Sequence, residues 1–227
     1  MEKKISNAFK YKGYDWQLDL RNSVGGFELG LTSGSTFYRD PKRLLFLLSR
    51  YKFVSKMIEA EASVLEIGCG DGFGSRIIRQ ICSRYTGIDI EPIFIEEAKV
   101  RYKQDGGSRF IQHDILKSTF VEKFGFIFSL DVLEHLPIEC DDLFFKNACD
   151  ALENEGVMIV GMPSLESQPY ASDNGIGHIN CKTGPDLKTA AQKHFKNVFL
   201  FEMNDEIIHT GFSKLAHYHL ILCCGKR

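Results

Sequence analysis

Short apolar runs alternate with longer helix-like segments from residue 63 onward. Seven runs have the length of a strand, are rich in β-branched or aromatic residues and end in polar residues or glycine: Ser63–Ile67, Tyr85–Ile88, Arg109–Gln112, Phe126–Leu130, Val157–Gly161, Val198–Phe201 and His217–Cys224. Four other segments have helical length and periodicity: Gly72–Ser83, Pro92–Lys103, Pro137–Leu152 and Gly184–His194. This alternation predicts an α/β fold with a mostly parallel seven-stranded sheet and helices on both faces. The last two runs are expected to pair antiparallel at one edge.

The first 60 residues follow a different pattern. Residues 1–40 are rich in aromatic residues and glycine, with weak periodicity. Pro41–Ala60 is expected to form an amphipathic helix, because its apolar positions recur with the three-and-four spacing of one helical face. We therefore divide the chain into an N-terminal helical extension (1–60) and an α/β domain (61–227).

Composition restricts the class of protein. The chain has 227 residues, of which 44% are hydrophobic and 26% charged, as in ordinary globular proteins. Its net charge of -2 argues against a broad surface for nucleic acid or anionic membrane. The sequence contains no run of 18 apolar residues, and its start lacks the apolar core of a signal peptide. We therefore expect a cytoplasmic protein without a membrane span. The seven cysteines include no Cys-x-x-Cys pair, which favours reduced thiols and no zinc site.

A glycine-rich turn follows the first predicted strand. Glycine occupies every second position of the segment Gly68-Cys69-Gly70-Asp71-Gly72. Such glycines allow positive φ and let a ligand approach the main chain at the carboxyl end of the strand. The spacing matches neither the dinucleotide fingerprint nor the phosphate-binding loop. Glu66, just before the turn, would repel a phosphate and favour a cation. The turn is therefore suited to a nucleoside with a positive substituent.

Acidic residues also follow the next three strands. Asp89 ends the second strand, where a carboxylate can accept hydrogen bonds from both hydroxyls of a ribose. Asp114 ends the third strand and is suited to accept a bond from an adenine amino group. Asp131 follows the fourth strand, where capping the next helix is an alternative role.

These segments, in this order, resemble the class I S-adenosylmethionine-dependent methyltransferases over roughly residues 60–200. Glu66–Gly72 matches the family's Glu-x-Gly-x-Gly-x-Gly loop, Gly87–Asp89 its ribose acid, His113-Asp114 its adenine acid, and Asp131–Leu136 the segment after strand four in the small-molecule branch. The resemblance implies a Rossmann-like fold, S-adenosylmethionine as cofactor and S-adenosylhomocysteine as product. It implies cofactor contacts from Glu66, Gly68, Cys69, Gly70, Asp89, Ile90, Asp114, Ile115, Leu130 and Asp131.

Two histidines are candidates for a general base, because the unperturbed imidazole pKa lies near neutrality. His135 comes directly after Glu134 at the expected mouth of the site, and an architectural role is the alternative. His178 lies in a glycine-rich loop that overhangs the acceptor pocket in the family, and anchoring that loop is the alternative. His217 and His219 share one face of the last strand, but two histidines are fewer than the three ligands usual at catalytic zinc. No metal site is predicted.

The acceptor is expected to be a small molecule. The aromatic N-terminus is a candidate lid, with packing on the domain as the alternative; its residues are Tyr11, Tyr14, Trp16, Phe37 and Tyr38, followed by Arg39. We name Tyr38, Arg39 and His178 as substrate contacts. A looser resemblance to methyltransferases found with bacterial surface-polysaccharide enzymes, carried by Arg50–Val54 and the tail from Met203, favours a sugar or sugar-nucleotide acceptor. No nucleic-acid partner is expected, and monomer and homodimer both stay open.

Two other classes of function remain. One is a non-catalytic S-adenosylmethionine-binding scaffold or regulatory subunit, which would combine an intact cofactor loop with a closed acceptor pocket. The other is a different nucleoside-using enzyme on the same fold, such as a decarboxylase or a spermidine-synthase-like transferase. The carboxylate-rich channel typical of the latter is not found in the sequence.

Overall fold

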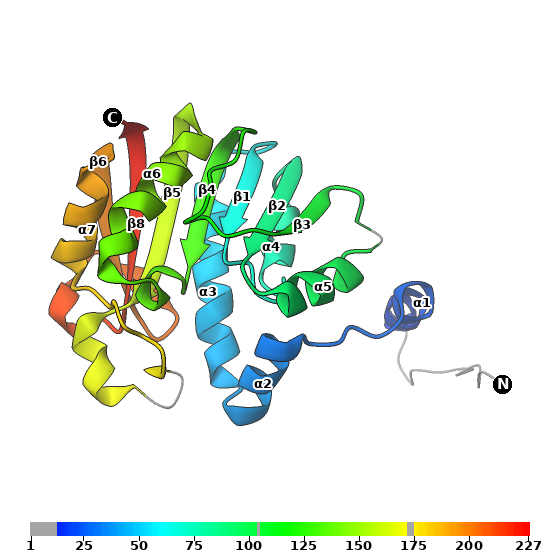
Figure 1. Cartoon of the computed structure of the whole chain (residues 1–227). Coiled ribbons are helices and arrows are strands. Elements are labelled where there is room, and N and C mark those ends of the chain that lie inside the picture. The colour runs from blue at the N-terminus through cyan, green and yellow to red at the C-terminus, as the bar shows by residue number, and fades with distance from the viewer. Residues whose placement is uncertain (1–12, 104, 172–174) are drawn as a thin grey trace.

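The structure, a computed structural model of the chain, describes residues 13–103, 105–171 and 175–227. One eight-stranded sheet forms its centre, in the order β3-β2-β1-β4-β5-β8-β6-β7 (Figure 1). The strands are β1 (Ser63–Ile67), β2 (Arg84–Asp89), β3 (Ser108–Gln112), β4 (Phe124–Leu130), β5 (Leu152–Pro163), β6 (Phe195–Asn204), β7 (Ile207–His209) and β8 (Tyr218–Lys226).

The sheet is parallel from β3 through β5 and changes direction at its C-terminal end. β8 pairs antiparallel with both β5 and β6, so it lies between them rather than at the edge. The predicted count of seven strands is wrong by one, because β7 pairs with the end of β6 as an eighth. β7 has only three residues, which is too short for an alternating pattern to reveal.

Helices cover both faces of the sheet, as predicted. The principal helices of the domain are α4 (Ser75–Arg79), α5 (Pro92–Arg101), α6 (Asp141–Ala151) and α7 (Gly184–Gln192). Short 3₁₀ turns occupy η1 (Leu133–His135), η2 (Ile138–Cys140), η3 (Leu165–Tyr170) and η5 (Ser213–Leu215). Side chains of β1 alternate between two buried clusters, because successive strand residues point to opposite faces. Val64 packs in the cluster that includes α4 and α5, whereas Leu65 and Ile67 pack in the cluster that includes α6 and α7.

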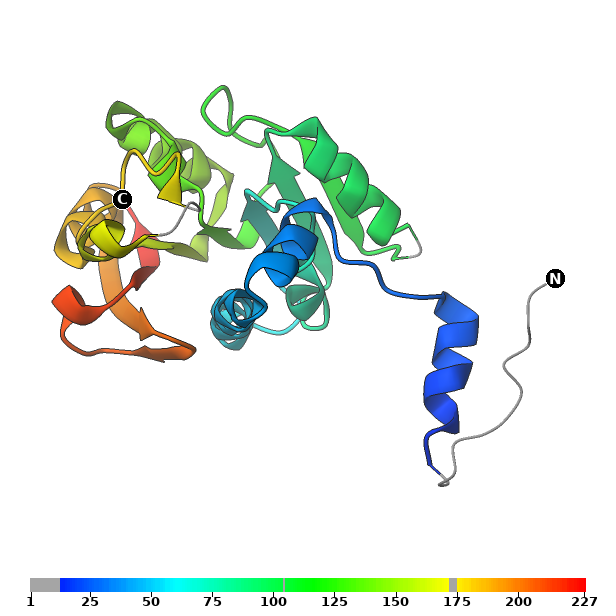
Figure 2. The same cartoon turned by 90° about the horizontal axis from the view of Figure 1, so that it is seen from below.

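In the described residues of the N-terminal extension, three helices differ in how they contact the sheet. α3 (Lys42–Met57) is the predicted amphipathic helix, and it buries Tyr51 and Val54 against the sheet. α2 (Leu31–Arg39) precedes it, and α1 (Asp15–Val24) buries no residue and projects from the body of the molecule (Figure 2). Trp16 is 60% exposed on α1, and Tyr11 lies outside the described residues. Among the described helices, none is long and apolar enough to cross a membrane.

Candidate functional site

The glycine turn after β1 adopts backbone conformations that require glycine. Gly68, Gly70 and Gly72 have φ of +80°, +52° and +72°, which is the left-handed region. A Cβ at Gly68 would also lie 2.1 Å from Cγ2 of Val132. The amides of Gly68 and Cys69 both donate to the carbonyl of Ile88, at 2.8 and 2.9 Å. The turn is therefore held against the end of β2.

The carboxylate of Asp89 organises the same turn from the end of β2. One of its oxygens accepts a bond from the amide of Gly70 at 2.9 Å, and the other accepts from the amide of Glu91 at 3.0 Å. Asp89 is partly exposed, so it is available both to the backbone and to a ligand. Its position at the strand tip is the one that the sequence predicts.

A cavity of 1210 Å³ opens at the carboxyl ends of the parallel strands. Nine of the ten predicted cofactor residues line it: Gly68, Cys69, Gly70, Asp89, Ile90, Asp114, Ile115, Leu130 and Asp131. Arg39, His135 and His178 line it too. Tyr38 does not, because its side chain is 91% exposed to solvent. The structure thus brings the predicted residues to one place, with Glu66 and Tyr38 as the exceptions.

Glu66 lies beneath the turn rather than in the cavity. On β1 it alternates with Leu65 and Ile67, so its side chain points to the face that α3 and α4 cover. There it is 1% exposed and accepts hydrogen bonds from the hydroxyls of Tyr51, Ser75 and Tyr85. Burial raises the pKa of Glu66 to about 7, although these three hydrogen bonds oppose the shift. This placement corrects the expected direct cofactor contact: Glu66 supports the turn from below.

Asp131 is bound by an arginine that the motifs do not predict. Nη1 of Arg50, on α3, donates to both carboxylate oxygens of Asp131, at 3.0 and 2.7 Å. The Arg50 guanidinium also lies 3.7 Å from the ring centre of Tyr218 on β8. Asp131 itself has φ of +57°, which is uncommon for a residue with a side chain. Arg50 lay within the looser resemblance, but no local pattern pairs it with Asp131.

Asp71 connects the glycine turn to α2. Its Oδ2 accepts bonds from the amide and the hydroxyl of Ser33, at 2.8 and 2.9 Å, and its Oδ1 accepts from the amide of Phe73 at 3.1 Å. Ser33 is 2% exposed and lines the cavity with its neighbour Thr32. Because α4 begins only at Ser75, Asp71 is not its N-cap, and its carboxylate instead fixes α2 beside the cavity.

The two candidate histidines lie together on the wall of the cavity. The rings of His135 and His178 are 5.1 Å apart between centroids, in an edge-to-face arrangement. Nδ1 of His135 is 3.1 Å from the carbonyl of Gly177, and Nδ1 of His178 is 3.1 Å from Oε1 of Gln168. Burial and the neighbouring His135 lower the pKa of His178. His178 is therefore neutral near pH 7, with one ring nitrogen able to accept a proton.

The chain matches one family of known proteins over its first four parallel strands. Residues 64–156, which contain the glycine turn, Asp89, Asp114 and Asp131, match the family described as methyltransferase domain. This part of the chain is therefore similar to a methyltransferase domain.

Two curated relatives each match less than half of this chain. Nodulation protein S of Bradyrhizobium diazoefficiens is 30% identical over 103 residues, which cover 43% of this chain and 49% of that protein. A ubiquinone biosynthesis O-methyltransferase of Histophilus somni is 31% identical over 99 residues, covering 40% of each. The matched stretches thus span at most about half the length of these relatives.

The similarity of fold extends beyond the matched residues. The N-methyltransferase NodS of Bradyrhizobium japonicum, solved with S-adenosylhomocysteine, superposes with a TM-score of 0.58 at 21% identity. The superposition covers 83% of this chain and 87% of that one. The chain therefore has the Rossmann-like fold of S-adenosylmethionine-dependent methyltransferases.

Proposed function

We propose that the chain transfers the methyl group of S-adenosylmethionine to an oxygen or nitrogen of a small molecule. One observation carries the proposal: the glycine turn, Asp89 and Asp114 line a single cavity at the carboxyl ends of parallel strands. Open α/β sheets bind nucleosides at this edge. The match of residues 64–156 to a methyltransferase domain, and the relatives named as methyltransferases, support the same activity.

The cavity fits the parts of S-adenosylmethionine in turn. Asp89 would accept bonds from the ribose hydroxyls, and Asp114, beside Ile115 and Ile90, would hold the adenine. The turn at Gly68 and Gly70 presents main chain to the amino-acid part. In place of the direct contact first expected of Glu66, the buried carboxyl would hold the turn in shape through Tyr51, Ser75 and Tyr85.

The cofactor supplies an electrophilic methyl group, so the protein's work is chiefly to align the acceptor and exclude water. A lone pair of the acceptor forms the new bond to the methyl carbon, and the electron pair of the broken carbon–sulfur bond stays on sulfur. A hydroxyl acceptor also loses a proton, which neutral His178 or His135 would accept at Nε2. An amine acceptor needs only to be held deprotonated.

Two arginines on the cavity wall support an acceptor that carries negative charge. Arg39 and Arg43 line the cavity from the end of α2 and the start of α3, and Nε of Arg43 lies 3.9 Å from Asp40. Guanidinium groups bind phosphate well, because their planar donors match its oxygens. This supports a sugar nucleotide as acceptor, and it revises the expected substrate contacts to Arg39 and His178 without Tyr38.

Calorimetric titration with S-adenosylmethionine and S-adenosylhomocysteine tests the proposal. We expect micromolar binding of both ligands and a loss of at least a hundredfold in affinity with Asp89→Ala, because hydrogen bonds to a charged group contribute about 1.5–3 kcal/mol each. Glu96→Ala on α5 is the matched control, since that exposed carboxylate pairs only with Lys99 among the described residues. Absence of binding to either ligand would refute the enzyme and favour the scaffold alternative.

A further inference from the structure

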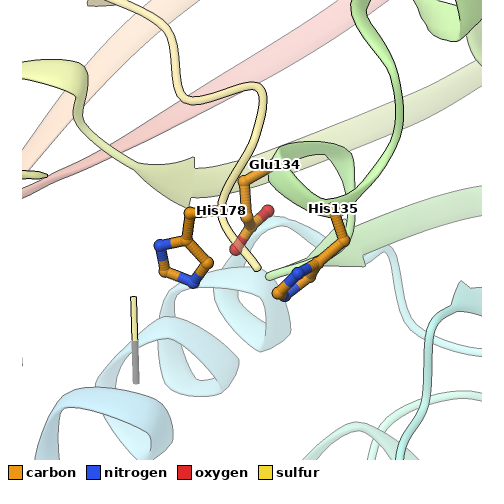
Figure 3. Close-up of side chains that lie close together, drawn as sticks. All are labelled: Glu134, His135 and His178. Carbon is orange, nitrogen blue, oxygen red and sulfur yellow. The ribbon is translucent and has the colours of Figure 1, made fainter. Parts of the chain in front are cut away.

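Glu134, His135 and His178 converge on one point of the cavity wall. Each offers one potential ligand atom, and these three atoms all lie within 4.8 Å of one another. Glu134 and His135 belong to η1, whereas His178 comes from the loop that follows η3. Figure 3 shows the Glu134 carboxylate directed into the space between the two imidazole rings.

The hydrogen bonds at Nδ1 of His135 and of His178 leave Nε2 of each ring free to accept. The carbonyl of Gly177 can only accept, so Nδ1 of His135 carries the proton. Nε2 of Gln168 donates to the carbonyl of Ser164 at 2.9 Å, which turns its Oε1 toward Nδ1 of His178. In each neutral ring, Nε2 therefore has an available lone pair. Outer hydrogen bonds of this kind orient the histidines of metal sites.

The carboxyl group of Glu134 accepts no hydrogen bond within the described part of the chain, and the charge of Arg50 acts on it only through space. The side chain of Glu134 is 0% exposed. An unpaired buried carboxylate is costly, so such groups in proteins are normally paired or coordinate a metal. Two imidazole nitrogens and a carboxylate, with no donor between them, form a site for a cation.

The backbone holds the three side chains together without any ion. The amides of Ile179 and Asn180 both donate to the carbonyl of Glu134, at 2.9 and 3.0 Å. Nδ2 of Asn180 donates to Oδ1 of Asp141 at 2.9 Å, and the buried ammonium of Lys182 binds Asn180 and Asp141 at 2.7 Å each. The loop bearing His178 is thus fixed to η1 by bonds independent of the three ligands.

We propose that Glu134, His135 and His178 bind a divalent transition-metal ion such as Zn²⁺, Mn²⁺ or Fe²⁺. Imidazole ligands favour these ions over Mg²⁺ and Ca²⁺, which prefer all-oxygen sites. Zinc–ligand distances are about 2.1 Å, so the ligand atoms of one tetrahedral ion lie about 3.4 Å apart. Three protein ligands leave coordination positions open, and those positions face the cavity because all three residues line it.

The open positions suit an oxygen of the acceptor. A hydroxyl that binds such an ion loses its proton to solvent water more readily. The ion would then replace a histidine base, since an Nε2 that binds metal cannot also accept a proton. This consequence rests on the proposed function, whereas the binding of metal does not.

Titration of the metal-free full chain with Co²⁺ alone tests the site, because Co²⁺ bound by nitrogen and oxygen absorbs visible light. We expect one equivalent to bind and to raise the melting temperature. Glu134→Gln and His178→Ala should each weaken binding at least tenfold. His209→Ala is the matched control, because that histidine lies on β7 and bonds to Asn204. Glu134→Gln keeps the shape of the buried side chain, whereas His178→Ala shortens a half-buried one. The melting temperature of each variant without metal shows whether it folds.

The outcomes separate this site from the methyl-transfer proposal. Equal Co²⁺ affinity in wild type and Glu134→Gln, absence of stoichiometric binding, or an intense thiolate-to-cobalt band from cysteine ligands would overturn the site. Any of these results together with normal S-adenosylmethionine binding would leave the methyltransferase intact. Metal binding without S-adenosylmethionine binding would uphold the site and refute the proposed function.

Discussion

Arg50 on α3 and Asp131 at the end of β4 form a two-point ion pair, with Nη1 of Arg50 at 3.0 and 2.7 Å from the two carboxylate oxygens. The pair joins the N-terminal extension to the edge of the sheet where the cavity lies. α3 is therefore part of the site's framework, although it precedes the residues that match a methyltransferase domain.

Replacing Arg50 should destabilise the fold through Asp131. Arg50→Met keeps the apolar stem over Tyr218 but removes the partner of a part-buried carboxylate, so the free energy of unfolding should fall by about 2 kcal/mol. Urea unfolding measures this. The double variant Arg50→Met, Asp131→Asn should recover part of the loss, because no unpaired charge remains. Strictly additive losses would show that the ion pair contributes nothing.

Glu66 should make the stability depend on pH. Its pKa is about 7 in the folded chain against an ordinary 4.5, so the folded chain holds a proton that the unfolded chain has released between these values. The free energy of unfolding should therefore fall by roughly 3 kcal/mol as pH rises from 4.5 to beyond 7. Urea unfolding at several pH values should show this slope in wild type. Glu66→Gln should lose the part of the slope that Glu66 contributes, whereas the part from Glu134, whose pKa is also raised by burial, should remain. Glu96→Gln, at an exposed site, should keep the slope.

Two glycines of the turn should respond differently to alanine. Gly68→Ala would place a Cβ 2.1 Å from Val132 in a left-handed backbone, so a loss of at least about 3 kcal/mol in unfolding free energy is expected. Gly70→Ala meets nothing within 4 Å and has only the backbone cost, about 1 kcal/mol. Thermal unfolding of the two variants provides the comparison. Equal losses would contradict the close approach of Val132 to the turn.

Ser33 should influence ligand affinity through Asp71. Ser33→Ala removes the hydroxyl bond to Asp71 and the bond from the amide of Gly30 to the same hydroxyl. With α2 less firmly held beside the cavity, S-adenosylmethionine should bind about fivefold more weakly, which corresponds to about 1 kcal/mol. Limited proteolysis should cut faster near α2. Ser23→Ala on α1 is the control, and an unchanged Kd in Ser33→Ala would mean that α2 does not shape the site.

The pattern of apolar and polar residues predicted most of the strands and helices around the site. The features that it did not predict have physical causes. Asp89 and Asp114 lie at the edge where the sequence predicts them, because the carboxyl ends of parallel strands meet there. Glu66 alternates with Leu65 and Ile67 and therefore points to the opposite face of β1. Both faces of β1 are buried, so the pattern of the strand does not show which face meets the cavity. β7 was not predicted, because its three residues are too few to show the period of two that marks a strand.

The sequence by itself determined the α/β architecture, the glycine turn and the row of acids at the strand ends. These features depend on neighbours within a few residues and on periodicities of 2 and 3.6. Only the tertiary structure decided that Arg50 meets Asp131 and that His178 meets Glu134 and His135. Such contacts depend on how α3 and the loop after β5 return to the sheet, which is set by packing between distant segments rather than by local pattern.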